Sequence, residues 1–241
     1  MLATTHNTPR PDAIRPRTVR TAELNPSIGI RKVIIASITG NVPAEHHEDA
    51  IGLLLETLDS DDDEMRGLAI VAMFELDREH PLVLKALVQS VADVSVSVRR
   101  RAIRSLGNIG RNVSYSLPWL IPAVHDWDMS VVMESVAAIG NFGDESEAAI
   151  PALMGWLTHP ELRIRTIVTI ALSRIGQNVI PFAMAALKNP DADSRERAAA
   201  LLGRLNAPED AVLEALLESM SDEDETVRLT ARGALERLAA V

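Results

Sequence analysis

Histidine beside acidic residues is the combination in this sequence that could bind a metal ion. His47 and Glu48 are adjacent, with Glu45, His46 and Asp49 around them. Imidazole and carboxylate groups hold a divalent metal when they converge from separate elements. The other histidines do not recur at equivalent positions that would complete such a site. We therefore interpret this cluster as a solvated charged segment near the start of a helix, and we predict no metal site and no cofactor.

The sequence contains no motif for nucleophilic catalysis. The chain contains no cysteine, which excludes thiolate catalysis, disulfides and cysteine-ligated metals. Serine and threonine are plentiful, but no G-x-S-x-G turn and no phosphate-binding glycine loop occurs. The acidic run 59–64 lacks the central glycine and the distal glutamate of a calcium-binding loop. The sequence therefore predicts a protein that is not an enzyme.

A short pattern, usually an apolar residue followed by arginine, recurs along almost the whole chain. Successive copies are separated by 35, 33, 33, 33, 30 and 33 residues, and valine replaces the arginine in the fourth copy. A period of this length is typical of stacked structural repeats. The copies are Ile30-Arg31, Met65-Arg66, Val98-Arg99, Val131-Val132, Ile164-Arg165, Ser194-Arg195 and Val227-Arg228.

Each copy lies between two sets of apolar residues at helical spacing. In the third repeat, Leu84, Leu87 and Val91 precede the pattern, and Ala102 and Leu106 follow it. Separations of three and four residues mark the buried stripe of an amphipathic helix. Each repeat is therefore predicted to be a pair of helices, with the arginine near the start of the second helix.

The repeats predict an all-α fold, a right-handed α-solenoid of about seven helix pairs with a degenerate first repeat. Residues 25–241 would form this single solenoid, in which each repeat contacts only its neighbours. Residues 1–24 contain three prolines and more basic than acidic residues, so we predict a flexible basic N-terminal arm. The arm lacks an apolar run long enough for a signal peptide or membrane span. We expect a soluble, cytoplasmic protein that does not contact membranes, and the oligomeric state is left open.

A compact polar residue stands five positions before each copy of the pattern, in the predicted turn between paired helices. Such side chains accept hydrogen bonds from the free N–H groups of the next helix, and an acid can also bind an arginine of a neighbouring repeat. We therefore predict that these residues join the repeats to one another. The arginines predicted to make these links are Arg31, Arg66, Arg99, Arg165, Arg195 and Arg228. The predicted turn acids are Asp93, Asp126 and Asp222.

Two stretches resemble a known repeat signature. Residues 98–110, VRRRAIRSLGNIG, and residues 164–176, IRTIVTIALSRIG, resemble the HEAT-like repeats of the bilin (phycobilisome) lyase type. The resemblance covers about residues 25 to 241, and it implies that the second helices line the concave side of the solenoid. It implies less about function, because the family includes lyase subunits, scaffolds, a metal hydroxylase and unclassified bacterial proteins.

The second helices have a net positive charge, although the formal net charge of the chain is −10. This contrast predicts a basic inner face under an acidic outer shell. Apolar residues at expected solvent-facing positions of these helices predict a groove for an apolar peptide or helix, with arginines for its acidic groups. Alternatively, the aliphatic residues are buried between helices. The predicted partner-binding residues are Val33, Leu68, Val71, Arg100, Arg101, Arg104, Met133, Ile167, Ile170 and Arg197.

Three functions are weighed on this basis. The first is a non-catalytic protein–protein interaction scaffold, whose groove binds a partner segment that carries apolar and acidic groups. The second, implied by the resemblance, is a bilin-lyase-like subunit or a chromophore-handling protein whose arginine cluster would meet bilin propionates. The third is a nucleic-acid binder similar to the HEAT-type alkylpurine DNA glycosylases. An isoelectric point near 5.1 and 3% aromatic residues disfavour the third function, so we predict no nucleic acid.

Overall fold

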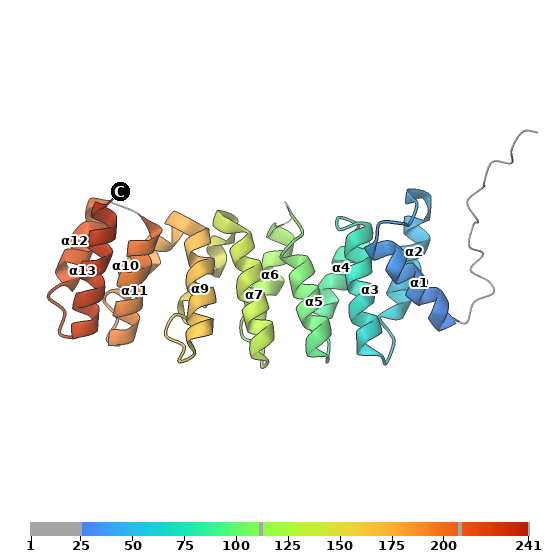
Figure 1. Ribbon diagram of the computed structural model, residues 1–241, viewed down its shortest axis with the longest axis horizontal. Coiled ribbons are helices and arrows are strands. Elements are labelled where there is room, and N and C mark those ends of the chain that lie inside the picture. Colours follow the sequence, from blue (N-terminus) through green and yellow to red (C-terminus); the bar gives the residue numbers. More distant parts are fainter. Residues whose placement is uncertain (1–25, 111–112, 207–208, 241) are drawn as a thin grey trace, which may run out of the picture.

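The chain is an α-solenoid, as the computed structural model shows for residues 26–110, 113–206 and 209–240 (Figure 1). Within these ranges helices alternate with short turns and no strand is present. The predicted arm, residues 1–24, lies outside the described residues. The helices are α1 (Pro26–Ile38), α2 (His47–Thr57), α3 (Asp63–Leu76), α4 (Pro81–Ser90), α5 (Val96–Leu106), α6 (Val113–Ala123), α7 (Met129–Asn141), α8 (Ile150–Met154), α9 (Leu162–Ile175), α10 (Ile180–Ala186), α11 (Ala192–Leu205), α12 (Asp210–Ser219) and α13 (Glu225–Ala239), with 3-10 helices η2 (Ala44–His46), η3 (Gly143–Ala149) and η4 (Gly176–Val179).

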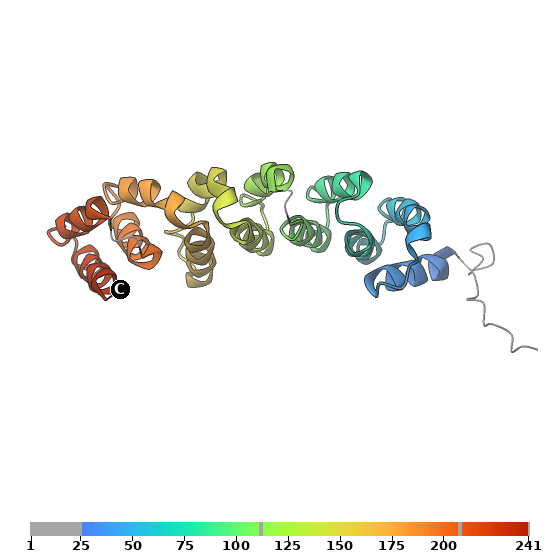
Figure 2. The same cartoon turned by 90° about the horizontal axis from the view of Figure 1, so that it is seen from above.

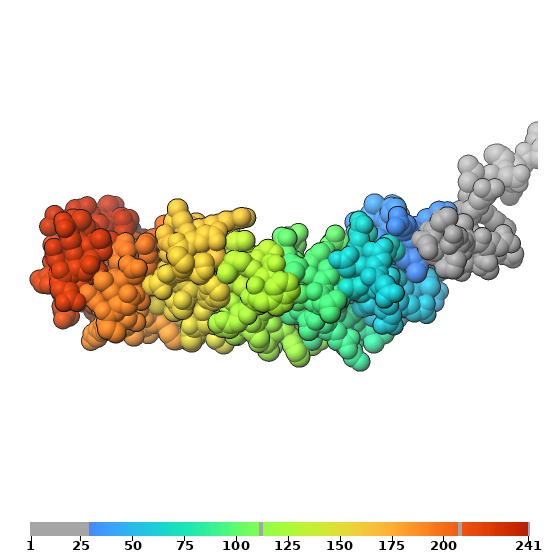
Figure 3. Space-filling model, turned by 90° about the horizontal axis from the view of Figure 1, so that it is seen from below, coloured from blue at the N-terminus to red at the C-terminus, as the bar shows by residue number. Residues whose placement is uncertain are grey.

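The helices form two layers that bend into a shallow arc. The odd-numbered helices, α1 to α13, line the inner side of the arc, and the even-numbered helices, α2 to α12, line the outer side (Figure 2). The space-filling view from below shows the repeats following one another in chain order (Figure 3). Because each odd-numbered helix contains one copy of the sequence pattern, residues at one register position recur along the concave face.

Aspartate caps several of the inner helices. Asp62, Asp128, Asp191 and Asp224 are N-cap residues whose carboxylates accept hydrogen bonds from the first N–H groups of α3, α7, α11 and α13. A cap of this kind stabilises a helix by about 1 kcal/mol. We predicted from the sequence that the residues two positions earlier cap these helices, and this part of the prediction was wrong. Those earlier residues instead accept the N–H of the residue two positions ahead, as Asp93 does from Ser95 at 2.7 Å.

Small residues bring neighbouring inner helices close together. A Cβ atom added to Gly140 of α7 would lie 2.9 Å from the Cα of Ala171 of α9. At Gly107, the residue that follows α5, an added Cβ would lie 2.8 Å from the Cα of Ala138 of α7. Real Cβ atoms essentially never approach other atoms this closely. Glycine at these positions therefore sets the spacing of the concave face, because any larger residue would push the helices apart.

One stretch of the described chain, Leu162–Ala186, is long and apolar enough to cross a membrane by length and composition alone. In the structure this stretch is divided between α9, η4 and α10. The division falls at Gly176, whose φ of 80° is a backbone conformation that favours glycine. Its apolar residues include Leu172 and Ile180, which are buried in the core of the solenoid. The stretch is two packed helices of the stack and is not convincing as a membrane span.

Candidate functional site on the concave face

Three arginines of the repeated pattern bind an aspartate of the next repeat through two parallel hydrogen bonds. Arg99 is representative: its Nε lies 2.8 Å from Oδ2 of Asp126, and its Nη2 lies 2.8 Å from Oδ1. Both side chains are largely buried. Paired hydrogen bonds between guanidinium and carboxylate are strong and directional. The three pairs are Arg66 with Asp93, Arg99 with Asp126, and Arg195 with Asp222.

These three arginines, together with Arg165 and Arg228, also bind the turn of their own repeat. Nη1 donates to the backbone carbonyl six residues earlier in Arg66, Arg99, Arg165, Arg195 and Arg228, at 2.8 to 3.0 Å. Arg165 has no acidic partner in the next repeat, where the turn residue is Asn189. Arg31 is exposed and makes no ion pair among the described residues. The geometry of the buried arginines is thus that of a link between repeats.

The exception at Val132 also fits this arrangement. Where valine replaces the arginine, the turn of the next repeat carries His159 in place of aspartate. His159 lies 5.4 Å from the ring of Trp156, which lies 6.2 Å from the ring of His125. A buried carboxylate without a cation would be costly, and the chain does not place one there.

The arginines of these pairs lower the pKa values of two of their aspartate partners. The hydrogen bonds from Arg66 hold the pKa of the Asp93 carboxyl below its usual range, and burial opposes this shift. Arg195 lowers the pKa of Asp222 in the same way. Each carboxylate also accepts a backbone N–H, which lowers its pKa further. These aspartates are therefore charged in the folded protein at neutral pH.

The arginine cluster predicted to bind a partner is partly neutralised within the protein. Arg104 of α5 donates two hydrogen bonds, each 2.8 Å long, to Glu134 of α7, which raises the pKa of Arg104. Arg100 lies 3.5 Å from the same carboxylate. Arg101 packs over Gly67 of α3. Arg197, in a separate repeat, lies 3.4 Å from Glu196 of its own helix. The structure places these arginines on inner helices. Glu134 already pairs with Arg104 and lies close to Arg100, so these two arginines are partly neutralised before any partner binds.

The predicted aliphatic residues are neither fully exposed nor fully buried. Ile170 is 41% exposed, while Val33, Leu68, Val71, Met133 and Ile167 are half-buried. Four of the half-buried residues, Val71 being the exception, pack against the core. A depression of about 210 Å³ lies between α7 and α9, and its lining brings together Ile167 and Ile170. The remaining lining residues are Ala137, Gly140, Ala171 and Arg174.

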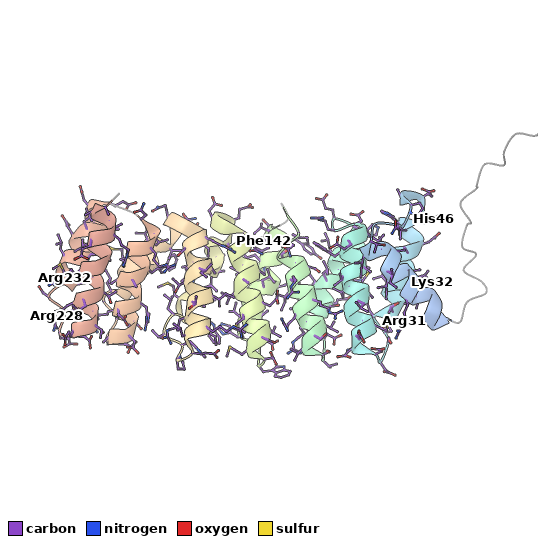
Figure 4. The ribbon with its side chains drawn as sticks, viewed as in Figure 1. Arg31, Lys32, His46, Phe142, Arg228 and Arg232 are labelled. Carbon is purple, nitrogen blue, oxygen red and sulfur yellow. The ribbon has the colours of Figure 1, made fainter. Side chains whose placement is uncertain are left out.

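Two rows of residues recur at fixed positions of the inner helices between α7 and α13. The apolar row consists of Ala137, Ile170, Ala200 and Gly233, each six residues after the first residue of its pattern. The basic row consists of Arg174, Arg204 and Arg237, each ten residues after that residue and each exposed. Figure 4 looks onto the inner helices, with Arg228 and Arg232 at the α13 end and Arg31 and Lys32 at the α1 end.

The sequence interpretation missed the basic row, although a signal for it was present. The residues predicted to bind a partner lie two, three or six positions after the first residue of each pattern. A further step of four residues continues the same helical stripe, as Ile170 and Arg174 show by lining one depression. That step would have found all three arginines of the row.

The outer face differs from the expected acidic shell. Helices α6, α8 and α10 carry no charged residue, whereas α2 and α12 each carry three acidic residues. Tyr115 and Trp119 of α6 are 39% and 46% exposed, and Trp127 in the following turn is 77% exposed. Three of the seven aromatic residues of the chain are thus exposed in or just after α6.

The histidine cluster near α2 makes local contacts. Nε2 of His47 lies 3.1 Å from the carbonyl oxygen of Val42, and Nε2 of His80 lies 3.1 Å from Glu48. His46 is exposed. Among the residues that the structure describes, no three side chains of histidine, aspartate or glutamate converge as a metal site would require.

Comparison with known proteins identifies repeats of one kind. The family model for HEAT repeats matches residues 84–173 and 117–201. No curated protein matches the sequence. Similar solved structures include importin beta, with 15% identity over 87% of this chain and 33% of that chain and a TM-score of 0.65. The archaeal HEAT-like repeats protein from Thermococcus onnurineus NA1 is 16% identical over 79% of this chain and 80% of that chain, with a TM-score of 0.52.

A third similar structure is the complex of CpcE and CpcF of phycocyanin lyase from Nostoc sp. PCC7120. It is 23% identical over 78% of this chain and 76% of that chain, with a TM-score of 0.49. At these levels of identity, the likeness to importin beta and to the archaeal protein concerns the fold.

Proposed function

We propose that this chain, which belongs to the HEAT-repeat family, is a non-catalytic scaffold that holds a segment of a partner protein on its concave face. Repeat solenoids of this kind are typical of protein-interaction scaffolds, because stacking creates a long continuous surface. Localisation in the cytoplasm is part of the proposal. The bound segment would carry apolar and acidic groups.

The observation that carries this proposal is the depression between α7 and α9. Ile167 and Ile170 line it and remain partly exposed. Arg174 lies at the edge of the same depression. Apolar side chains beside a cation suit an amphipathic protein segment, since such a segment buries apolar area and pairs charges at once.

The test replaces the two isoleucines by serine, Ile167→Ser with Ile170→Ser, in the full chain. Partners are captured from an extract of the native source by immobilised protein and quantified by mass spectrometry. Burial of two isoleucine side chains contributes about 1.5 to 3 kcal/mol each, so we expect at least tenfold less of the partner.

A matched variant, Leu82→Ser with Leu217→Ser, changes two exposed leucines of the outer helices α4 and α12. This variant should capture the partner as the unchanged protein does. Equal loss in both variants, or no loss in the isoleucine variant, would show that the concave face is not the binding surface. Melting temperatures of all three proteins establish that each one is folded.

A further inference from the structure

We propose that the solenoid has a hinge at the joint between α9 and α11, about which the repeats on either side rotate as two units. In the described ranges, α9 packs on α11 more weakly than any other pair of neighbouring inner helices packs together (Figure 1). Each repeat of a solenoid contacts only its neighbours, so the stack bends most easily at its weakest interface. This inference concerns the free chain and goes beyond the proposed function.

The joint lacks the arginine–aspartate pair that links other repeats. Arg165 is held in the usual way, because its Nη1 donates to the carbonyls of His159 and Pro160 at 2.8 and 2.7 Å. The position of the aspartate is occupied by Asn189, whose Oδ1 accepts the N–H of Asp191 at 2.9 Å. An amide nitrogen is a donor, so it cannot accept a hydrogen bond from a guanidinium group. Nε of Arg165 is buried and has no hydrogen-bond partner among the described residues.

The joint also lacks the close approach of glycine to alanine that sets the spacing of other inner helices. At the corresponding positions of α9 and α11 the chain has Ser173 and Leu201, and Leu201 is buried. The distance between packed helices depends on the side chains at their contact, so larger residues at these positions keep the two backbones apart. The pairs that approach closely at other joints are Gly107 with Ala138, Gly140 with Ala171, and Gly203 with Ala234.

The combination of both losses distinguishes this joint. The joint between α7 and α9 also has no arginine–aspartate pair, but it keeps the close approach of Gly140 to Ala171. The joint between α3 and α5 has no glycine at this position, but it keeps Arg66 with Asp93. From α3 to α13, only the joint between α9 and α11 lacks both features. The sequence period changes here as well, since the two copies of the pattern that flank the joint are 30 residues apart.

The hinge divides the concave face into two parts. The depression lined by Ile167 and Ile170 lies before the joint, whereas Ala200 and Gly233 of the apolar row lie after it. Rotation of one unit against the other therefore changes the distance between these two parts of the face. Hinges of this kind let rigid elements move together while the packing within each element is kept.

The experiment measures distances between nitroxide spin labels in the full chain by double electron–electron resonance. The chain contains no cysteine, so introduced cysteines carry the only labels. One pair, Arg163→Cys with Thr226→Cys, spans the hinge and the joint between α11 and α13. The other pair, Ser97→Cys with Arg163→Cys, spans the joints between α5 and α7 and between α7 and α9. We expect the distance distribution across the hinge to be about twice as wide as the other.

The label positions are matched so that the widths can be compared. Ser97, Arg163 and Thr226 each lie one residue before the first residue of their pattern, near the start of an inner helix. Each is at least partly exposed. Because each pair spans two joints, a difference in width reports on the joint between α9 and α11.

A single substitution should close the hinge. Asn189→Asp supplies the missing carboxylate to Arg165, so the distribution across the hinge should narrow to about the width of the other pair. The distribution between positions 97 and 163 should not change. Asn189→Asp combined with Arg165→Met should restore the broad distribution, because the new carboxylate then has no cation. Asn108→Asp, which changes an exposed amide outside the joint, should leave both distributions as they are.

The outcomes decide the inference without a partner. A broad distribution across the hinge that Asn189→Asp narrows, but not in the presence of Arg165→Met, supports it. Equal widths of the two pairs in the otherwise unchanged chain would overturn it. So would a distribution across the hinge that stays broad with Asn189→Asp, since the missing pair would then not be what loosens the joint. Far-ultraviolet circular dichroism establishes that every labelled variant is folded.

Discussion

Arg99 and Asp126 join two repeats through a pair of parallel hydrogen bonds that is covered by an aromatic ring. Both bonds are 2.8 Å long, and the guanidinium carbon of Arg99 lies 4.7 Å from the centre of the Trp127 ring. Arg99 also donates to the carbonyl of Asp93 in its own turn. One side chain thus fixes the turn of its own repeat and the position of the next repeat.

Removal of this arginine should leave a carboxylate without its cation. We expect Arg99→Met to lower the free energy of unfolding by about 3 kcal/mol, because Asp126 is largely buried and would lose its partner. Arg165→Met is the matched control, since Arg165 binds only the carbonyls of its own turn. Its cost should be about 1 kcal/mol. Urea unfolding measures both values, and equal losses would show that the inter-repeat pair contributes nothing.

Acid should destabilise the solenoid through the same links. Arg66 and Arg195 lower the pKa values of Asp93 and Asp222 in the folded state, relative to about 3.9 in an unfolded chain. A lowered folded-state pKa contributes stability that is complete above the unfolded-state value and is lost as the pH falls through the folded-state value. We therefore expect the melting temperature to decrease below about pH 4.

The acid effect is assigned by substitution. The variant Asp93→Asn, Asp222→Asn should be less stable than the unchanged chain at pH 7, and its stability should depend less on pH below about pH 4. Asp49→Asn with Asp210→Asn removes two exposed acids and should leave the pH dependence as it was. The prediction is wrong if the two double variants show the same pH profile.

The spacing of the inner helices should depend on glycine. Gly140→Ala would place a methyl group 2.9 Å from the backbone of Ala171, so α7 and α9 must shift, at a cost of about 1 to 3 kcal/mol. Gly52→Ala in α2 meets no atom within 4 Å and should instead stabilise by up to about 1 kcal/mol. Thermal unfolding should give changes of opposite sign, and a shared sign would refute the close-packing account.

The repeats and their paired helices could be predicted from the sequence, because the same residue pattern recurs along the chain. The period of the arginine pattern predicted stacked repeats, the apolar residues around it predicted paired helices, and the structure confirms the solenoid. The neutralisation of Arg104 was not predictable in this way. Its partner Glu134 is 30 residues distant, and their contact depends on how closely α5 approaches α7. The lack of charge on the outer helices α6, α8 and α10 was missed for another reason, since the net charge of the chain averages over outer helices that differ.

The central claim, that the concave face is where a partner binds, is tested most directly by site-specific photo-crosslinking. A benzophenone amino acid replaces Ala200 in the apolar row, or Ala185 on the outer helix α10, and each full-length protein is irradiated in an extract of the native source. We predict a covalent adduct with one discrete protein from position 200 and none from position 185. The same adduct from both positions, or from position 185 alone, would contradict the claim.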